Sequence, residues 1–261
     1  MRPWQVLENV NTREGVLELR RRGERDFLMT IGGRVLMNSQ HHRSEDVLAD
    51  MACHELALAK KSRPRVLLGG LGMGYTLRAA LDQLPPRAVV TVVDLNRKVV
   101  DWNRGPLGPL AKFPIDDPRV QVVVDDVAHV IARAKPGTFD AILFDLYEGP
   151  HNTVNRDRHP LYGSLAIEHT RAALAPDGIF AVWSEESDPP FEERLKAQGF
   201  VVTRQRSGEG GRLHIVYLAQ VGELPRGRTP PERGPQRAPS RSPAGRQPGR
   251  QPVRQPGRRQ P

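Results

Sequence analysis

Short apolar runs that end in glycine or aspartate constrain the fold more than any other feature of this sequence. Four of them lie at 66–68, 89–93, 120–124 and 139–144. Stretches with helical spacing alternate with them, at 75–84, 127–134, 162–175 and 190–198. Continuous apolar strands that alternate with helices are typical of a parallel sheet covered on both faces. The chain is therefore predicted to be an α/β protein.

Three further runs complete the predicted sheet. A fifth strand is expected at 179–183, after the turn residues Pro176-Asp177-Gly178. The last two runs, 200–205 and 213–219, have the pattern of a closing hairpin. A hairpin joins antiparallel strands, so the last strand of an otherwise parallel sheet is expected to be antiparallel.

The segment before this pattern alternates apolar and polar residues, which predicts short β-strands. These strands are expected around 16–19, 27–31 and 35–37, joined by glycine-containing turns. The period changes at Ser44, which can cap a helix that extends to about residue 60. We therefore predict a small antiparallel β-meander over 1–43 and the α/β domain over 44–224.

The C-terminal segment 225–261 differs from the rest in composition. It holds ten arginines, ten prolines, one acid and no aromatic residue. Residues 1–224 therefore keep 39 − 10 = 29 basic and 30 − 1 = 29 acidic residues, so the formal charge of +9 belongs to the tail. Because the tail has no hydrophobic face to offset the entropy of ordering, it is predicted to be disordered. It is expected to be a solvated extension or, alternatively, to bind nucleic acid or acidic surfaces through its charge.

Other classes of protein are not expected from this sequence. No window has the ~18 consecutive apolar residues of a transmembrane helix, and the N-terminus lacks the apolar run of a signal peptide. Cys53 is the sole cysteine, which excludes an internal disulfide and a four-cysteine zinc site. No metal site is expected, because neighbouring residues such as Cys53 and His54 usually lie in a core or on a surface. A cytoplasmic protein is predicted.

A glycine-rich loop, GGLGMG at 69–74, lies between an apolar run and a helix. Gly70, Gly72 and Gly74 allow a tight turn and a close approach of the backbone to a ligand. Asp94 ends the next run, where a carboxylate can accept hydrogen bonds from both hydroxyls of a ribose. Together they predict an adenosine-containing ligand. The alternative is that the glycines form only a helix–strand contact and that Asp94 is a solvated cap.

Aspartates also end the next two runs. Asp125 and Asp126 follow the strand predicted at 120–124, and Asp145 follows the strand predicted at 139–144. In an open parallel sheet the ligand crevice lies beyond the carboxyl ends of the strands, so these acids are expected to point into one crevice. The alternative for each is a helix cap, which is a common role for an aspartate after a strand.

These motifs, in this order, resemble the spermidine/spermine synthase family, which has the class I S-adenosylmethionine-dependent methyltransferase fold. The resemblance covers about residues 15–220 and rests on GGLGMG at 69–74, Asp94, DDPRV at 116–120, Asp126 and Asp145. It implies a Rossmann-like nucleoside-binding domain in which Asp94 holds the ribose and Asp126 lies near the adenine. It also implies S-adenosylmethionine or its decarboxylated form as donor, an amine such as putrescine as acceptor, and a homodimer.

Two positions depart from the family's pattern. Met73 stands where the synthases have a loop aspartate that pairs with the aminopropyl amine. Glu148 stands where they have an aspartate that helps to deprotonate the attacking amine. A glutamate can still act as a base, so we expect Glu148 to take the proton, Asp145 to hold the amine and Tyr147 to line the pocket.

The resemblance also indicates residues around the rim of the crevice. Gln40 and His42 lie between meander and helix, where the family places substrate contacts, although a polar connecting loop is the alternative. The segment 151–159 resembles a flap over the crevice, with an ordinary surface loop as the alternative. Glu185, at the end of the fifth strand, is a further candidate for contact with an amine.

Three functional hypotheses remain open at this point. The first is a spermidine-synthase-like transferase that binds decarboxylated S-adenosylmethionine or a related donor and aminopropylates a polyamine. The second is a small-molecule methyltransferase that uses ordinary S-adenosylmethionine and would tolerate Met73 more easily. The third is a catalytically silent protein that keeps the nucleoside pocket. A fold alone does not decide among them.

Overall fold

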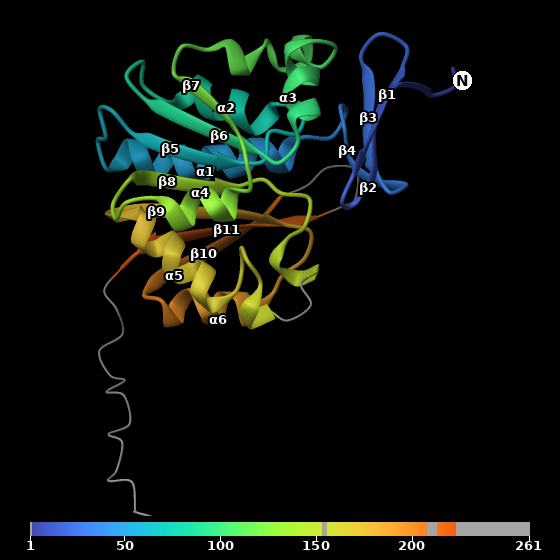
Figure 1. Cartoon of the computed structure of the whole chain (residues 1–261). Coiled ribbons are helices and arrows are strands. Elements are labelled where there is room, and N and C mark those ends of the chain that lie inside the picture. The colour runs from blue at the N-terminus through green and yellow to red at the C-terminus, as the bar shows by residue number, and fades with distance from the viewer. Residues whose placement is uncertain (1, 153–155, 208–212, 223–261) are drawn as a thin grey trace, which may run out of the picture. The chain divides into compact units, whose positions relative to one another are not determined.

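The computed structural model of the chain describes residues 2–152, 156–207 and 213–222 (Figure 1). All of these residues belong to one compact unit. The basic tail predicted at 225–261 and the middle of the flap predicted at 151–159 lie outside the described residues. The domain boundaries predicted at 43/44 and 224/225 stay predictions.

The N-terminal segment forms a four-stranded antiparallel sheet in chain order. Its strands are β1 (Gln5–Thr12), β2 (Gly15–Arg22), β3 (Asp26–Ile31) and β4 (Arg34–Asn38). The meander is therefore confirmed, with one strand more than predicted. β1 escaped prediction because it is an edge strand whose apolar side chains are largely exposed: Val6 is 49% exposed and Leu7 38%.

The main sheet has seven strands in the order β10-β11-β9-β8-β5-β6-β7. They are β5 (Arg65–Gly69), β6 (Val89–Asp94), β7 (Val120–Val124), β8 (Phe139–Phe144), β9 (Leu174–Ser184), β10 (Phe200–Ser207) and β11 (His214–Val221). The five strands from β9 to β7 in this order are parallel, while β11 pairs antiparallel with both of its neighbours. The predicted mostly parallel sheet with an antiparallel last strand is confirmed.

Helices cover both faces of this sheet, as Figure 1 shows. They are α1 (Arg43–Leu58), α2 (Tyr75–Gln83), α3 (Arg97–Arg104), α4 (Val127–Arg133), α5 (Ser164–Ala173) and α6 (Pro189–Ala197). Short 3₁₀ turns occupy Gly108–Ala111, Pro114–Asp116, Pro150–Asn152 and Arg156–Arg158. Among the described residues, no helix is long and apolar enough to cross a membrane.

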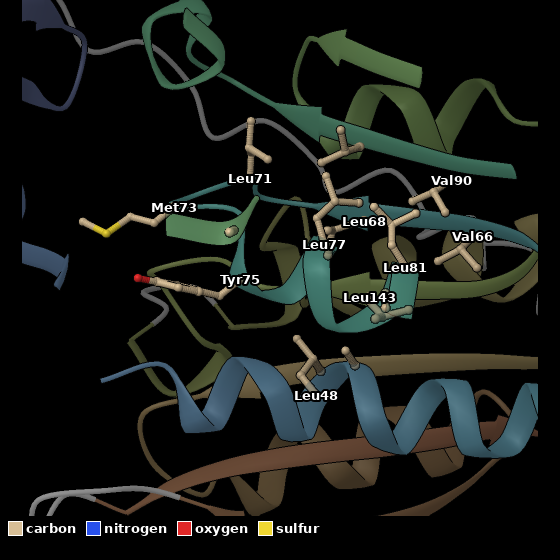
Figure 2. Packing of buried hydrophobic residues seen from close by; sticks show 14 of the residues in the cluster. Leu48, Val66, Leu68, Leu71, Met73, Tyr75, Leu77, Leu81, Val90 and Leu143 are labelled. Carbon is tan, nitrogen blue, oxygen red and sulfur yellow. The ribbon is translucent and has the colours of Figure 1, made fainter. Parts of the chain in front are cut away.

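Alternate residues of the buried strands serve two separate hydrophobic cores. Val66 and Leu68 of β5 join the core that includes the first three helices and the meander, whereas Leu67 joins the core under α4, α5 and α6. Leu77 of α2 and Leu48 of α1 both belong to the first core, and Figure 2 shows the two helices that carry them. The strands are apolar on both faces because helices cover both faces of the sheet.

The predicted turn at 176–178 lies inside β9 rather than before it. Phe139 pairs with Leu174, and the next pair along is Ala141 with Ile179, so the extra residues of β9 form an irregularity in the register. A proline and a glycine in a strand often mark such a bulge. The turn residues were identified correctly, but the strand begins before them.

The buried carboxylate of Asp140 anchors the start of β8 to β5 through an ion pair with the half-exposed Arg65. Its side chain is 7% exposed and accepts hydrogen bonds from the Arg65 backbone N–H at 2.8 Å and from Arg65 Nε at 3.1 Å. The Lys61 ammonium lies 3.4 Å away. Burial alone would raise the pKa of Asp140, but the hydrogen bonds and charges of Arg65 and Lys61 outweigh it and lower that pKa.

The substitution Asp140→Asn is expected to lower the free energy of unfolding by about 1–3 kcal/mol at neutral pH, because charge-assisted hydrogen bonds are lost. Because the pKa of Asp140 is lower in the folded chain than in the unfolded chain, its ionised carboxylate stabilises the fold at pH values above the unfolded-state pKa. This stabilisation is lost as the pH falls through the folded-state pKa. Chemical denaturation at pH 7 and in acid should therefore show the deficit shrinking in acid. Asp177→Asn, which removes the half-exposed partner of the same lysine, should cost far less. Equal losses in both variants would contradict this account.

Candidate active site

A cavity of about 360 Å³ lies where the meander meets the carboxyl ends of the parallel strands. Acids at its wall come from the meander, α1, the end of β6 and the loops that follow β7 and β8: Glu14, Glu45, Asp94, Asp125, Asp126, Asp145 and Glu148. Among the described residues, no lysine or arginine lines it. The volume is within the usual range for a small-molecule site, and the surplus of acids favours a cationic ligand.

The glycine-rich loop forms one wall of the cavity, and Gly70 is its tightest point. Gly70 has φ +91°, and a Cβ there would lie 2.1 Å from the Asp145 carbonyl oxygen. Gly72 also lines the cavity, and a Cβ there would meet the Met37 sulfur at 2.8 Å. Gly74 is not part of the wall: with φ +84° it begins α2, packed against Asn103. The ligand-binding role of these glycines stays a prediction.

Asp94 supports the same loop from the end of β6. One carboxylate oxygen accepts from the Leu71 N–H at 3.0 Å and the other from the Asn96 N–H at 2.8 Å. A carboxylate has about four acceptor sites, so Asp94 can still accept from ligand hydroxyls. Burial raises the pKa of Asp94 although these backbone hydrogen bonds oppose the shift.

Asp125 and Asp126 line the cavity and also hold the start of α4. Asp126 is the N-cap and accepts from the Ala128 N–H at 2.8 Å, so the capping alternative describes its local role. Asp125 accepts from the Asp126 N–H at 2.8 Å and from the Arg133 guanidinium. These two bonds lower its pKa. Neither role removes these acids from the cavity wall.

The floor of the cavity holds two carboxyl groups, Asp145 after β8 and Glu45 in the first turn of α1. Burial raises the pKa of Asp145 to about 7, and the charge of Glu45 adds to the shift. A hydrogen bond from the Thr76 hydroxyl at 2.5 Å opposes it. Burial also raises the pKa of Glu45. Two buried carboxyls that share a site hold a proton more readily than either would alone.

Tyr147 and Glu148 lie at the rim, where they meet the turns of the meander. The Tyr147 hydroxyl donates to Glu14 at 2.7 Å, and Arg34 lies 3.9 Å from the Glu148 carboxylate. Arg34 also lies over the Tyr147 ring, 5.9 Å from its centre. Burial and the neighbouring Glu14 raise the pKa of Tyr147. Both residues line the cavity from its outer edge, and the roles predicted for them stay predictions.

Gln40 and His42 do not line this cavity. Gln40 is exposed and donates to Asp26 at 2.7 Å. His42 stacks on Tyr75 with ring centres 4.1 Å apart and lies in a separate cavity of about 350 Å³. Asp26 holds Gln40 and Tyr75 holds His42 outside the cavity wall, so the geometry does not bring either side chain into the predicted site, and their role as substrate residues stays untested.

Of the two remaining candidates, the predicted flap and Glu185, only the flap contributes a residue to the cavity wall. His159, at the end of the predicted flap, lines the cavity, and burial followed by the charge of Arg194 lowers its pKa. Glu185 lies 3.7 Å from His151 and is not part of the cavity wall. In the parts of the chain that the structure describes, no group of three or more His, Cys, Asp or Glu side chains could hold a metal ion.

Glu45 is a cavity acid that sequence reasoning missed. An acid in the first turn of a helix is normally a favourable surface residue, because it faces the positive end of the helix dipole. Here it lies three residues before Leu48 and seven before Ala52, both fully buried, so it shares their face of α1. An acid in line with the apolar face of a helix was the available indication of a site.

Comparisons with known proteins agree on one family. Residues 45–198 match the model of the spermine/spermidine synthase domain. The polyamine aminopropyltransferase of Bacillus subtilis (strain 168) is 31% identical over 153 residues, 59% of this chain and 52% of that protein. That of Pyrobaculum calidifontis is 32% identical over 154 residues, 56% of this chain and 52% of that protein. The chain spans about half the length of these curated relatives.

Solved structures extend the similarity beyond the matched domain. A spermidine synthase from Thermotoga maritima gives a TM-score of 0.63 at 18% identity, covering 83% of this chain and 73% of that chain. A spermidine synthase in complex with the transition state analogue AdoDATO gives the same score and identity, covering 83% and 72%. At this identity the likeness establishes the fold alone, and it includes the sheet and the meander.

Proposed function

Because the chain belongs to the spermine/spermidine synthase family, we propose that it transfers an aminopropyl group from decarboxylated S-adenosylmethionine to a primary amine of a polyamine such as putrescine. The observation that carries the proposal is the cavity itself, in which the glycine-rich loop and the strand-end acids meet without a lysine or arginine among the described lining residues. Donor and acceptor are both cations, so a wall of carboxylates favours both. The names of the curated relatives support the same activity.

The donor is proposed to lie along the carboxyl ends of β5, β6 and β7. Gly70 and Gly72 would allow its close approach, and Asp94 would accept from the two ribose hydroxyls through the lone pairs that the backbone leaves free. Asp125 and Asp126 would lie beside the adenine. The cavity continues to Asp145, which would place the sulfonium between the nucleoside and the acceptor amine.

The reaction needs orientation and the removal of a proton. The acceptor amine must lose a proton before its lone pair attacks the carbon next to the sulfonium. The carbon–sulfur bond breaks, and its electron pair stays on sulfur, which leaves as a neutral thioether. The transferred carbon gains a bond to nitrogen, and one proton is released overall. Because the leaving group is neutral, holding the two reactants in line is the main task of the protein.

Met73 makes this a divergent member of the family. Its side chain is fully buried, on the loop between β5 and α2 (Figure 2). It supplies no carboxylate for the aminopropyl amine, so other acids of the cavity must hold that cation. An ordinary S-adenosylmethionine carries a carboxylate that a loop aspartate would repel, and this chain lacks that repulsion.

A titration with both donors distinguishes these activities. The full chain is incubated with decarboxylated S-adenosylmethionine and putrescine, and separately with ordinary S-adenosylmethionine and the same amine. We expect a rise in melting temperature with the decarboxylated donor, since a ligand that binds the folded state stabilises it, and an aminopropylated product by mass spectrometry. Methyl transfer alone would replace the proposal with the methyltransferase hypothesis. Binding without any product would favour the silent protein.

Asp94→Asn is expected to weaken donor binding about 10- to 70-fold, measured by calorimetry. Loss of one charge-assisted bidentate contact costs about 1.5–2.5 kcal/mol, and the amide would also turn a donor toward a backbone N–H. Asp101→Asn on the exposed side of α3 is the matched control and should bind normally. Equal affinity of the wild type and Asp94→Asn would remove the proposed ribose contact.

A further inference from the structure

The predicted base, Glu148, is poorly placed to take a proton inside the cavity. Its side chain is 44% exposed, and the Arg34 guanidinium lies 3.9 Å from its carboxylate. Water and the guanidinium both satisfy its charge at the rim. Removal from water makes a carboxylate a stronger proton acceptor, and Glu148 at the rim stays largely in contact with water. The geometry therefore favours a base that lies deeper.

Glu45 meets that requirement. It is 9% exposed, lines the cavity and comes from α1, which packs against β8, β9 and β11. The charged and titratable groups that act on it are Asp145 after β8, Tyr75 at the start of α2, the N-cap residue His42 of its own helix, and Asp46 beside it. Of these, Asp145 shares the cavity floor with it, so a bound ammonium would lie between two carboxyls.

A hydrogen-bonded chain holds Glu45 from behind. The Ser44 hydroxyl donates to the Glu45 carboxylate at 2.6 Å. Since a hydroxyl has one hydrogen, its 3.1 Å contact with His214 Nδ1 requires that His214 donates to Ser44. His214 is the first residue of β11, and its ring lies 5.0 Å from that of Trp183, which also lines the cavity. A donor–hydroxyl–carboxylate chain of this kind fixes the direction of the carboxylate.

On the premise of the aminopropyl transfer proposed above, we propose that Glu45 accepts the proton of the attacking amine, and that Ser44 and His214 are positioning residues that hold its carboxylate. The acceptor ammonium binds between Glu45 and Asp145. Its proton moves to Glu45, and the freed lone pair attacks the carbon next to sulfur. The carbon–sulfur electron pair leaves with the thioether. Glu45 releases its proton to solvent after the product departs, which restores the carboxylate.

The central test compares Glu45→Gln with Glu55→Gln. Glu55 lies on the same helix, outside the cavity, and accepts from Gln220 at 2.6 Å, so its variant controls for a change of charge on α1. We expect Glu45→Gln to keep donor binding and to lower kcat by about 10²- to 10⁴-fold, the usual size of a general-base effect. Glu148→Gln should lose less than about tenfold. A kcat for Glu45→Gln within threefold of wild type, or a larger loss in Glu148→Gln, would overturn the assignment.

The positioning role of His214 is tested with a conservative pair. His214→Asn keeps an N–H donor near the Nδ1 position, whereas His214→Ala removes it. We expect His214→Ala to shift the acid limb of the pH–rate profile, because the hydrogen-bonding of Glu45 changes, and His214→Asn to restore most of it. The same profile in wild type and both variants would show that His214 is only structural.

A failure of the proposed function is distinguished by an amine-binding measurement. If the wild type forms no aminopropylated product, the transfer proposal fails, and putrescine affinity is then compared in wild type, Glu45→Gln and Glu55→Gln. If putrescine affinity falls about tenfold or more in Glu45→Gln alone, Glu45 is still supported as the group that faces the amine. Equal affinity in all three, or no binding to any, would overturn the inference about Glu45 as well.

Discussion

Gly70→Ala should abolish measurable donor binding and lower the free energy of unfolding by about 2–5 kcal/mol. The backbone of Gly70 has φ +91°, which L-residues rarely adopt, and the added Cβ would lie 2.1 Å from the Asp145 carbonyl oxygen. That obstacle is backbone, so the loop or the end of β8 must shift, as in an overpacked core. Either shift displaces the cavity wall. Thermal melting and calorimetry with the decarboxylated donor would measure the two effects.

Gly137→Ala is the matched control for this prediction. Gly137 also has positive φ, +69°, but a Cβ there would meet no atom within 4 Å. Its variant should lose only the conformational cost, about 1–2 kcal/mol, and should bind the donor normally. If Gly70→Ala is no less stable than Gly137→Ala and binds as well as wild type, the close approach of the loop to β8 is unimportant.

The strand ends explain why much of the cavity could be predicted. A parallel sheet brings the carboxyl ends of its strands to one edge, so Asp94, Asp126 and Asp145 had to lie near one another once the strands were recognised. Gly70 and Gly72 follow for the same reason. These positions depend on local pattern and topology alone, and both can be recognised in the sequence.

The remaining part of the cavity depends on packing between distant segments. The meander supplies Glu14, which bonds Tyr147 across 133 positions of sequence, and no local pattern encodes that contact. The direction of the loop that holds Gln40 and His42 depends on contacts of the same kind, with Asp26 and Tyr75. Glu45 was hidden for another reason, since an acid in the first turn of a helix needs no special explanation.

Asp145→Asn should remove activity and stabilise the protein at alkaline pH, a pair of opposite effects. Burial and the charge of Glu45 raise the pKa of Asp145 from 3.8 to about 7. The folded chain therefore holds this proton more tightly than the unfolded chain does. The resulting stability is fully present below about pH 4 and is lost as the pH rises through about 7. An asparagine carries no charge at any pH and can still accept the hydrogen bond from Thr76.

The gain of Asp145→Asn over wild type should thus be absent near pH 4 and reach on the order of 2–4 kcal/mol at pH 8, from about 1.4 kcal/mol for each pKa unit. Melting curves across this range measure the gain in stability, while kcat should fall about 10²-fold or more because the ammonium loses one of its two carboxylates.

Asp125→Asn provides the contrast, since the Asp126 N–H and Arg133 lower the pKa of Asp125. Loss of the Asp125 charge should therefore destabilise the protein at neutral pH. A stability difference for Asp145→Asn that does not grow with pH would show that the Asp145 carboxyl is not strained by its surroundings. Among the described residues, no lysine or arginine lines the cavity to offset the charge of the ionised Asp145 carboxylate. A bound ammonium would supply that positive charge and so relieve the destabilisation.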